Sequence, residues 1–244
     1  MKQAFILLIS IVVVFVAPDA QGTAHLSFSN TTANVTRAGC GSTVLCVDTP
    51  RGCDPSTNNT CLFAAVNGTA VMAPNGTNLT VQLSGTSNNN SFIAFALTAN
   101  ASEGTSMLYV CGRNNTASGV NGTFFFLTAQ RNNTNQMITI MSRNMTTMQN
   151  TTTVTKIQCV FDVPGVNASR SRTEDTTFVL LLGSGMVNGS TLGPFIANVT
   201  TTALNLLDPT SNLNTTMSGA NRALLPQALP LLLSIFVLSI LKTA

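Results

Sequence analysis

Few side chains in this 244-residue chain could carry out catalysis. His25 is its only histidine, and it lies in a polar stretch without strand or helix periodicity. A histidine in such a place does not favour a buried catalytic triad or a histidine-based metal site. Asp162, Glu174 and Asp175 are possible acid or base groups, but no spacing singles out a pair. Surface solvation explains them better, so we expect no enzymatic activity.

Cysteine is the other residue type with distinctive chemistry. The six cysteines are Cys40, Cys46, Cys53, Cys61, Cys111 and Cys159. An even number without Cys-x-x-Cys pairs or accompanying histidine indicates disulfides in a secreted chain rather than a metal site. Cys53 and Cys61 are predicted to pair, because they are close in sequence and flank a turn rich in Pro and Asn. The other four are expected to attach the N-terminal segment to a sheet.

The elements that would position these residues are strands. Apolar residues alternate with polar ones at 79–83, the period of a strand with one buried face. The unbroken apolar run at 92–97 is typical of a strand buried on both faces or in a sandwich core. The connection at 84–90 is rich in Ser, Gly and Asn, and it predicts a hairpin between these two strands.

Further strands are predicted wherever apolar runs alternate with segments rich in Gly, Asn and Ser. The expected strands are 77–84, 91–98, 106–111, 122–129, 136–143, 153–162 and 176–183, with shorter candidates at 62–66, 69–73 and 194–199. No helical periodicity separates them, which favours an all-β sandwich or barrel. About 150 residues suffice for one such core, so we expect a single domain at 40–199.

Three of these segments and the cysteine-rich entry carry a family resemblance. The segments are 81–87 (VQLSGTS), 92–97 (FIAFAL) and 107–111 (MLYVC). Together they resemble the DOMON domain, named after the N-terminal domain type of dopamine β-monooxygenase. The entry, 40–63, is similar to that of the subfamily in ferric-chelate-reductase-like and stromal-receptor-like proteins. The resemblance covers 40–199 and implies an immunoglobulin-like β-sandwich.

The same resemblance raises the question of haem. Cytochrome-type DOMON domains are expected to hold a b-type haem between a Met after the Leu-Ser-Gly segment and a His near the last strands. This chain has Glu103 where the resemblance requires that Met, and no histidine after Gly183. Met107 and Met186 are weak candidate ligands that core or loop packing explains more simply. We therefore expect no haem cofactor; the alternative is a b-type haem-binding electron-transfer domain related to ferric-chelate reductases.

The N-terminal sequence predicts a secretory route. Residues 1–20 have the order of a cleaved signal peptide, a basic start followed by an apolar run too short to span a bilayer comfortably. Cleavage after Ala20 or Gly22 is consistent with this pattern. The following polar segment, 21–39, is interpreted as an exposed lead-in or an edge segment.

The C-terminal sequence predicts attachment to a membrane. Residues 200–218 are rich in Thr and Asn and are interpreted as a stalk. Small residues, a spacer and an apolar tail follow at 219–244, the order of a glycosylphosphatidylinositol (GPI) signal, with Ser218 as the attachment residue. The alternative is a single transmembrane helix at 224–241, which two prolines interrupt near its start.

Asparagine-linked glycosylation is predicted at many positions, most of them expected in loops. The chain has 17 Asn-x-Ser/Thr sites: Asn30, Asn34, Asn58, Asn67, Asn75, Asn78, Asn89, Asn100, Asn114, Asn121, Asn132, Asn144, Asn150, Asn167, Asn188, Asn198 and Asn214. Only 8% of its residues are charged, with a formal net charge of +3. No basic patch indicates a nucleic-acid partner.

These expectations combine into one functional hypothesis. We expect a glycosylated, lipid-anchored β-sandwich at the extracellular face of the plasma membrane. It would act as a non-catalytic binding or interaction module whose ligand or partner the sequence does not identify.

Overall fold

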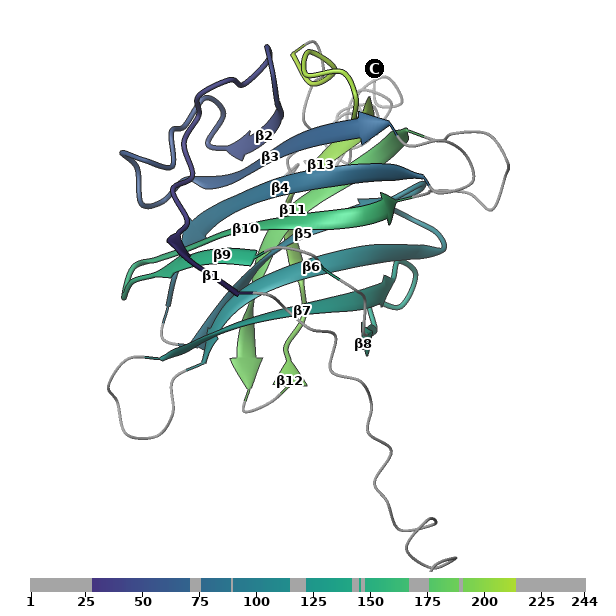
Figure 1. Cartoon of the computed structure of the whole chain (residues 1–244). Coiled ribbons are helices and arrows are strands. Elements are labelled where there is room, and N and C mark those ends of the chain that lie inside the picture. The colour runs from purple at the N-terminus through teal and green to yellow at the C-terminus, as the bar shows by residue number, and fades with distance from the viewer. Residues whose placement is uncertain are drawn as a thin grey trace, which may run out of the picture.

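The chain folds into strands and turns that form two sheets packed face to face (Figure 1). The computed structural model describes residues 28–70, 76–88, 90–114, 122–141, 145, 148–166, 176–188 and 191–213. The predicted all-β sandwich is therefore confirmed. The expected signal peptide at 1–20, Ser218 and the C-terminal signal at 219–244 lie outside the described residues. Within those residues, no helix has the length and apolar character needed to span a membrane.

The first sheet has six strands, in the spatial order β1-β9-β10-β4-β3-β2. They are β1 (Phe28–Thr32), β2 (Leu45–Thr49), β3 (Leu62–Ala70), β4 (Thr77–Thr86), β9 (Met148–Thr152) and β10 (Lys156–Val166). Neighbouring strands are antiparallel except β1 and β9, which are parallel. The alternation at 79–83 has its predicted effect, because Leu79, Val81 and Leu83 are buried in the core between the sheets.

The second sheet has seven strands, in the order β12-β11-β5-β6-β7-β8, with β13 also paired to β11. They are β5 (Asn90–Thr98), β6 (Thr105–Asn114), β7 (Thr123–Asn132), β8 (Ile138–Met141), β11 (Thr177–Asn188), β12 (Thr191–Leu192) and β13 (Ile196–Asn205). All of its pairs are antiparallel. β5 is buried on both faces, as its apolar run predicts. Ile93 and Phe95 face the core between the sheets, whereas Phe92 and Ala94 lie in a second apolar cluster.

The predicted hairpin between β4 and β5 is wrong. β4 pairs with β3 and β10 in the first sheet, whereas β5 pairs with β6 and β11 in the second. The connection therefore crosses from one sheet to the other. The Ser87 amide donates to the Thr155 carbonyl at 2.9 Å, which fixes the crossing against the turn between β9 and β10. A turn-rich connection shows where the chain reverses direction, but it does not show which strands will pair.

The sandwich also continues further along the chain than the sequence predicts. Residue 199 is the expected end of the domain, yet β13 extends to Asn205 and the packed chain to Leu213. Val199 and Leu204 are buried within this segment. Its many threonines, which suggest a stalk by composition, are β-branched residues that also suit a strand. The stalk expected at 200–218 therefore cannot begin before residue 214.

Strands with few apolar residues are missed by sequence patterns. β9 has the sequence MQNTT and forms a strand through its pairing with β10. β2 and β12 are likewise not predicted, and the candidates at 62–66 and 69–73 correspond to one strand, β3. The lead-in at 21–39 contains β1, an edge strand, which agrees with one of its two interpretations. It is not exposed throughout, because Val35 is fully buried against Cys61 and Phe63.

A disulfide and aromatic contacts join the two sheets where β6 faces β10. Cys111 of β6 bonds to Cys159 of β10, across a sequence separation of 48 residues. Two residues away on each strand, Tyr109 stacks on Phe161 with 5.6 Å between ring centroids. Phe126 of β7 also contacts Phe161, at 5.0 Å. Covalent and apolar contacts therefore close the sandwich at the same place.

The remaining cysteines form two local bridges. Cys53 bonds to Cys61, the pairing that the sequence predicts, and Cys40 bonds to Cys46. The expectation that four cysteines attach the N-terminal segment to a sheet is only half right. Cys40–Cys46 attaches the entry to β2, whereas the other two cysteines join sheet to sheet. Sequence spacing does not reveal a bridge between strands that are distant in the chain.

The outer face of the second sheet is covered by the chain that follows β11. Phe195 lies over this face, in the second apolar cluster with Phe92 and Ala94. A Cβ at Gly183 would lie 2.1 Å from the Ile196 carbonyl oxygen, and one at Gly185 would lie 2.5 Å from that of Pro194. Glycine at both positions therefore permits the close crossing of segment 193–197 that buries Phe195.

The bridge between the sheets should contribute more to stability than the local bridge at the entry. In the chain-entropy description, loops of 48 and 6 residues differ by about 2 kcal/mol at 25 °C. We predict that replacing Cys111 and Cys159 by Ala lowers the free energy of unfolding by about 2 kcal/mol more than replacing Cys40 and Cys46. Urea unfolding of both double variants measures the difference. Equal losses would contradict this account.

Candidate functional site

One candidate site is an apolar hollow at the end of the outer face of the second sheet. Its volume is about 330 Å³. Its lining consists of Asn114, Thr123, Phe125, Phe126, Leu127, Val187 and Leu192. These residues come from β6, β7, β11 and β12, so strand pairing brings distant segments together here. The lining has no acid, base or thiol, so it offers apolar surface and two polar side chains for contact with a ligand.

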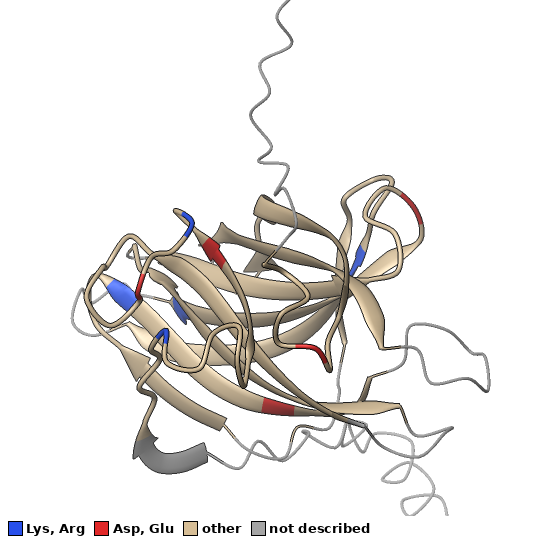
Figure 2. Cartoon of the chain, turned by 90° about the horizontal axis from the view of Figure 1, so that it is seen from above, with Lys and Arg blue, Asp and Glu red and all other residues tan. Residues whose placement is uncertain are grey.

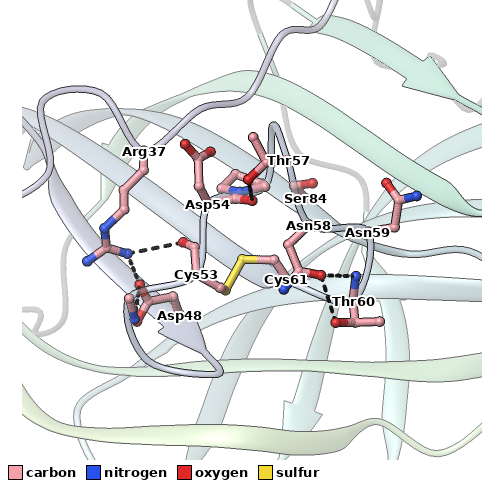
Figure 3. The surroundings of a disulfide bond; sticks show 12 residues. Arg37, Asp48, Cys53, Asp54, Thr57, Asn58, Asn59, Thr60, Cys61 and Ser84 are labelled. Carbon is pink, nitrogen blue, oxygen red and sulfur yellow. Dashed lines mark hydrogen bonds and ion pairs between the residues drawn. A yellow bond between two sulfur atoms is a disulfide. The ribbon is translucent and has the colours of Figure 1, made fainter.

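A second, polar hollow lies where the cysteine-rich entry meets the last described residues. Its volume is about 640 Å³. Its lining includes Arg37, Asp48, Arg51, Asp54 and Asn212. Figure 3 shows how Arg37 and Asp48 lie beside the Cys53–Cys61 bridge, which closes this part of the entry. No sequence pattern singles out these charged side chains.

The charged groups of this entry hollow are already occupied with one another and with the backbone. Arg37 forms an ion pair with the buried Asp48 and donates to the Cys53 carbonyl at 3.2 Å (Figure 3). The Gly52 amide donates to the Asp48 carboxylate at 3.1 Å. These contacts hold the entry in shape, because they satisfy a carboxylate that would be costly to bury alone.

Asp54 is not suited to acid or base chemistry at neutral pH. The backbone amide and the hydroxyl of Ser56 both donate to its carboxylate, each at 2.8 Å. These hydrogen bonds lower the pKa of Asp54 below its usual value, because they favour the charged form. An efficient acid or base needs a pKa near the working pH. The shift is therefore in the wrong direction for proton transfer.

The end of the described chain packs against the same entry. The Asn212 side-chain amide donates to the Cys46 carbonyl at 2.7 Å, and Arg51 donates to the Leu213 carbonyl at 3.1 Å. A Cβ at Gly41 would lie 3.3 Å from the Leu213 side chain. Residues more than 160 positions apart thus contact each other, and both the entry and residues 212–213 line the entry hollow.

A buried polar cluster lies at the opposite end of the outer face from the apolar hollow. Asn133 is its centre. Its side-chain nitrogen donates to Thr98 Oγ1 and to the carbonyls of Asn100 and Glu103, at 2.7 to 3.2 Å. Its side-chain oxygen accepts a hydrogen bond from Ser106 Oγ at 2.6 Å. Asn133 therefore ties the loop between β5 and β6 to the turn that precedes β8.

Arg131 is a buried cation in this cluster. It donates to Asn133 Oδ1 at 3.3 Å and to the Gln136 side chain, and its guanidinium lies 5.6 Å from the centre of the Phe195 ring. Among the described residues, Nε has no hydrogen-bond partner and the guanidinium has no carboxylate partner. Burial lowers the pKa of Arg131, although a guanidinium stays charged at neutral pH. No sequence pattern predicts this cluster, because its members occupy turns and strand ends.

The two candidate haem ligands lie far apart. Met107 is opposite Leu97 of β5, whereas Met186 is opposite Ser91 of the same strand. Six residues of extended strand separate the two positions by about 20 Å. Met107 packs against the core between the sheets, and Met186 is 57% exposed. These two side chains therefore cannot bind the same iron.

The other residues singled out from the sequence are not brought together either. Glu103 is exposed in the loop between β5 and β6. Asp162 accepts a hydrogen bond from Thr80 Oγ1 at 2.7 Å, on the outer side of the first sheet. His25, Glu174 and Asp175 lie outside the described residues. In the described ranges, no group of three or more His, Cys, Asp or Glu is arranged to hold a metal ion.

The predicted glycosylation sites are accessible wherever side-chain burial is described. Those exposed or half-buried are Asn34, Asn58, Asn67, Asn78, Asn100, Asn114, Asn132, Asn150, Asn188 and Asn198. Many of them lie in strands rather than in the expected loops; Asn67 in β3 and Asn78 in β4 are examples. Their side chains point outward from the sheet because alternate strand residues do so.

Charged residues are sparse and scattered over the described part of the chain, as Figure 2 shows. The sequence contains 11 Lys or Arg and 8 Asp or Glu. Within the described residues, the basic side chains do not form a stripe of the kind that binds nucleic acid. Three disulfides favour an extracellular or membrane-associated location.

Comparison with known proteins gives two similarities. The chain is 24% identical over 173 residues to the Danio rerio protein named "Putative ferric-chelate reductase 1"; the match covers 70% of this chain and 28% of that protein. Among solved structures, it is similar to the cytochrome domain of Myriococcum thermophilum cellobiose dehydrogenase, with a TM-score of 0.40 and 10% identity. That match covers 75% of this chain and 92% of the domain. No family model matches the chain.

Removal of the Asn133 side chain should destabilise the fold strongly. We predict that Asn133→Ala lowers the free energy of unfolding by about 3 kcal/mol, because several buried polar groups lose their partner at about 1–3 kcal/mol each. The substitution leaves the Asn132 glycosylation site intact, since the middle position of such a site accepts Ala. Asn59→Ala is the matched control: Asn59 is exposed and is also the middle residue of a site. Urea unfolding that gives similar losses for both variants would argue against a structural role for Asn133.

Proposed function

We propose that this chain is a non-catalytic binding or interaction module of the DOMON type at the cell surface. The observation that carries the proposal is the separation of Met107 and Met186 by about 20 Å along the second sheet. Two axial ligands of one haem iron must lie within a few ångströms of each other. The only histidine, His25, precedes the first cysteine by 15 residues. The residues of this chain therefore do not fit the ligand pair that the resemblance requires.

The side chains around the two hollows support a binding role. The apolar hollow is lined without an acid or base, and the carboxylates of the entry hollow are already engaged by hydrogen bonds or an ion pair. Contact with a ligand or protein partner requires only shape, apolar surface and a few polar groups. The rival function, haem-based electron transfer, is what the resemblance implies for cytochrome-type DOMON domains, and the match to the named reductase spans only 28% of that protein's length.

An absorption spectrum distinguishes the two functions. We predict that the protein purified from haem-supplied cells lacks a Soret band at near-stoichiometric haem content, because the axial pair is not assembled. Glu103→Met alone should not create the band, since it restores one ligand without an imidazole. A strong band in the unaltered protein that Met107→Leu or Met186→Leu removes would favour electron transfer.

Anchoring by lipid is the second part of the proposal. It rests on the small residues at 218–220 and the apolar run at 229–241 that follows a short spacer. We predict that phosphatidylinositol-specific phospholipase C releases the protein from intact cells into the medium. Ser218→Leu should reduce surface display, because the attachment site requires small residues. Retention on cells that release a known lipid-anchored protein would favour a transmembrane helix at 224–241.

A further inference from the structure

β8 is an exposed apolar edge strand. It lies at one edge of the second sheet, and among the described residues it pairs only with β7 (Figure 1). Met137, Ile140 and Met141 are 65%, 57% and 39% exposed. Edge strands in soluble proteins are usually protected by a charged residue, a proline or a bulge. Segment 137–141 has no charged residue or proline, and the pairing of β8 with β7 has no register shift.

Half of the backbone amide and carbonyl groups of β8 point away from β7. The Asn132 amide donates to the Met137 carbonyl at 2.9 Å, which marks 132 and 137 as a hydrogen-bonded pair. Hydrogen-bonded and non-hydrogen-bonded pairs alternate along an antiparallel ladder. Ile138 and Ile140, which are opposite Arg131 and Ala129, therefore fall in non-hydrogen-bonded pairs. Their amide and carbonyl groups point away from β7, and no other strand of the described part of the chain pairs with them.

The sequence of the segment is a palindrome. Residues 137–141 read Met-Ile-Thr-Ile-Met, with Thr139 at the centre. When two such strands pair antiparallel about Thr139, Ile138 of one copy is opposite Ile140 of the other. Met137 is then opposite Met141, and Thr139 is opposite itself. Each residue thus meets an identical residue on the same face of the sheet.

We propose that β8 pairs with β8 of a second copy of this chain, antiparallel about a two-fold axis at Thr139. In this register, Ile138 and Ile140 form the hydrogen-bonded pairs, so all four of their outward-directed backbone groups are satisfied. The isoleucines of both copies meet on the outer face, where Ile138 already packs against the second apolar cluster. Isoleucine pairs and a central threonine pair are favourable cross-strand neighbours.

A second copy fits this edge better than an unrelated peptide. A two-fold interface requires a surface complementary to itself, and a palindromic strand provides this at every position. No charged side chain of the segment opposes a like charge across the axis. The two seven-stranded sheets would join into one continuous sheet, and the exposed methionines of both copies would pack together. The pairing does not depend on the proposed binding role.

Disulfide trapping tests the register. Thr139 would be opposite itself in a non-hydrogen-bonded pair, with about 4.5 Å between Cα atoms, within the range of about 4.4–6.8 Å that disulfides span. In cells that display the full chain, Thr139→Cys should give a disulfide-linked dimer on a non-reducing gel, at least tenfold more than Thr202→Cys. Thr202 is an exposed threonine of β13, near the edge of the sheet opposite β8. Equal dimer from both variants would overturn the proposal.

Co-precipitation of two differently tagged full-length copies tests the pairing without a new cysteine. Ile140→Lys should reduce co-precipitation at least tenfold, because it places two lysines at the interface. Val154→Lys is the matched control: Val154 is 64% exposed in the turn between β9 and β10 and should have no effect. Unchanged association in Ile140→Lys, or association that begins only after enzymatic removal of glycans, would show that the natural chain does not pair through β8.

Discussion

The sandwich depends on the contact between β6 and β10, where its two sheets are closed. The Cys111–Cys159 bridge and the Tyr109–Phe161 stack join the same two strands, two residues apart. Both strands are central in their sheets, so this contact also fixes β4, β5, β7 and β9 through ordinary strand pairing. The disulfide limits the conformations of the unfolded chain, whereas the aromatic contact stabilises the folded one. The chain's only tyrosine is fully buried here, which removes it as a ring on which an exposed sugar could stack.

The second sheet has an apolar cluster on its outer face as well as on the face that packs against the first sheet. Segment 193–197 covers much of its outer face, and Gly183 and Gly185 permit that close approach. Arg131 then lies against the edge of this cover through its contact with Phe195. The polar cluster around Asn133 closes one end of the face, and the apolar hollow lies toward the other. This surface is therefore formed by segment 193–197 and the turn at Asn133 together with the ends of the strands.

The sequence was most informative about burial within a single strand. The alternation in β4 and the double burial of β5 follow directly from the order of apolar residues. Pairing could not be predicted in the same way, because β4 and β5 are consecutive in sequence and belong to different sheets. The Cys53–Cys61 bridge was predictable from its short spacing, whereas the bridge between sheets required knowledge of which strands face each other.

The candidate sites were less predictable still. Each of the two hollows is lined by segments that only the fold brings together, such as Arg37 and Asn212. Asn133 looks like any other asparagine in a chain rich in this residue, and only its burial reveals its role. The separation of Met107 and Met186 likewise follows from strand register, which residue counting does not supply. Residue types limited the possible chemistry, and register decided which residues could act together.

The docking of the last described residues on the cysteine-rich entry has a mechanical consequence. Asn212 and Leu213 are hydrogen-bonded to Cys46 and Arg51, so a pull on the chain beyond Leu213 acts on β2 as well as on β13. β2 is an edge strand that pairs with β3, and the Cys53–Cys61 bridge closes the connection between these two strands. In any arrangement that holds the chain by its C-terminal end, tension is therefore shared between the two sheets. The sandwich would resist such a load across both of its layers instead of unravelling from β13 alone.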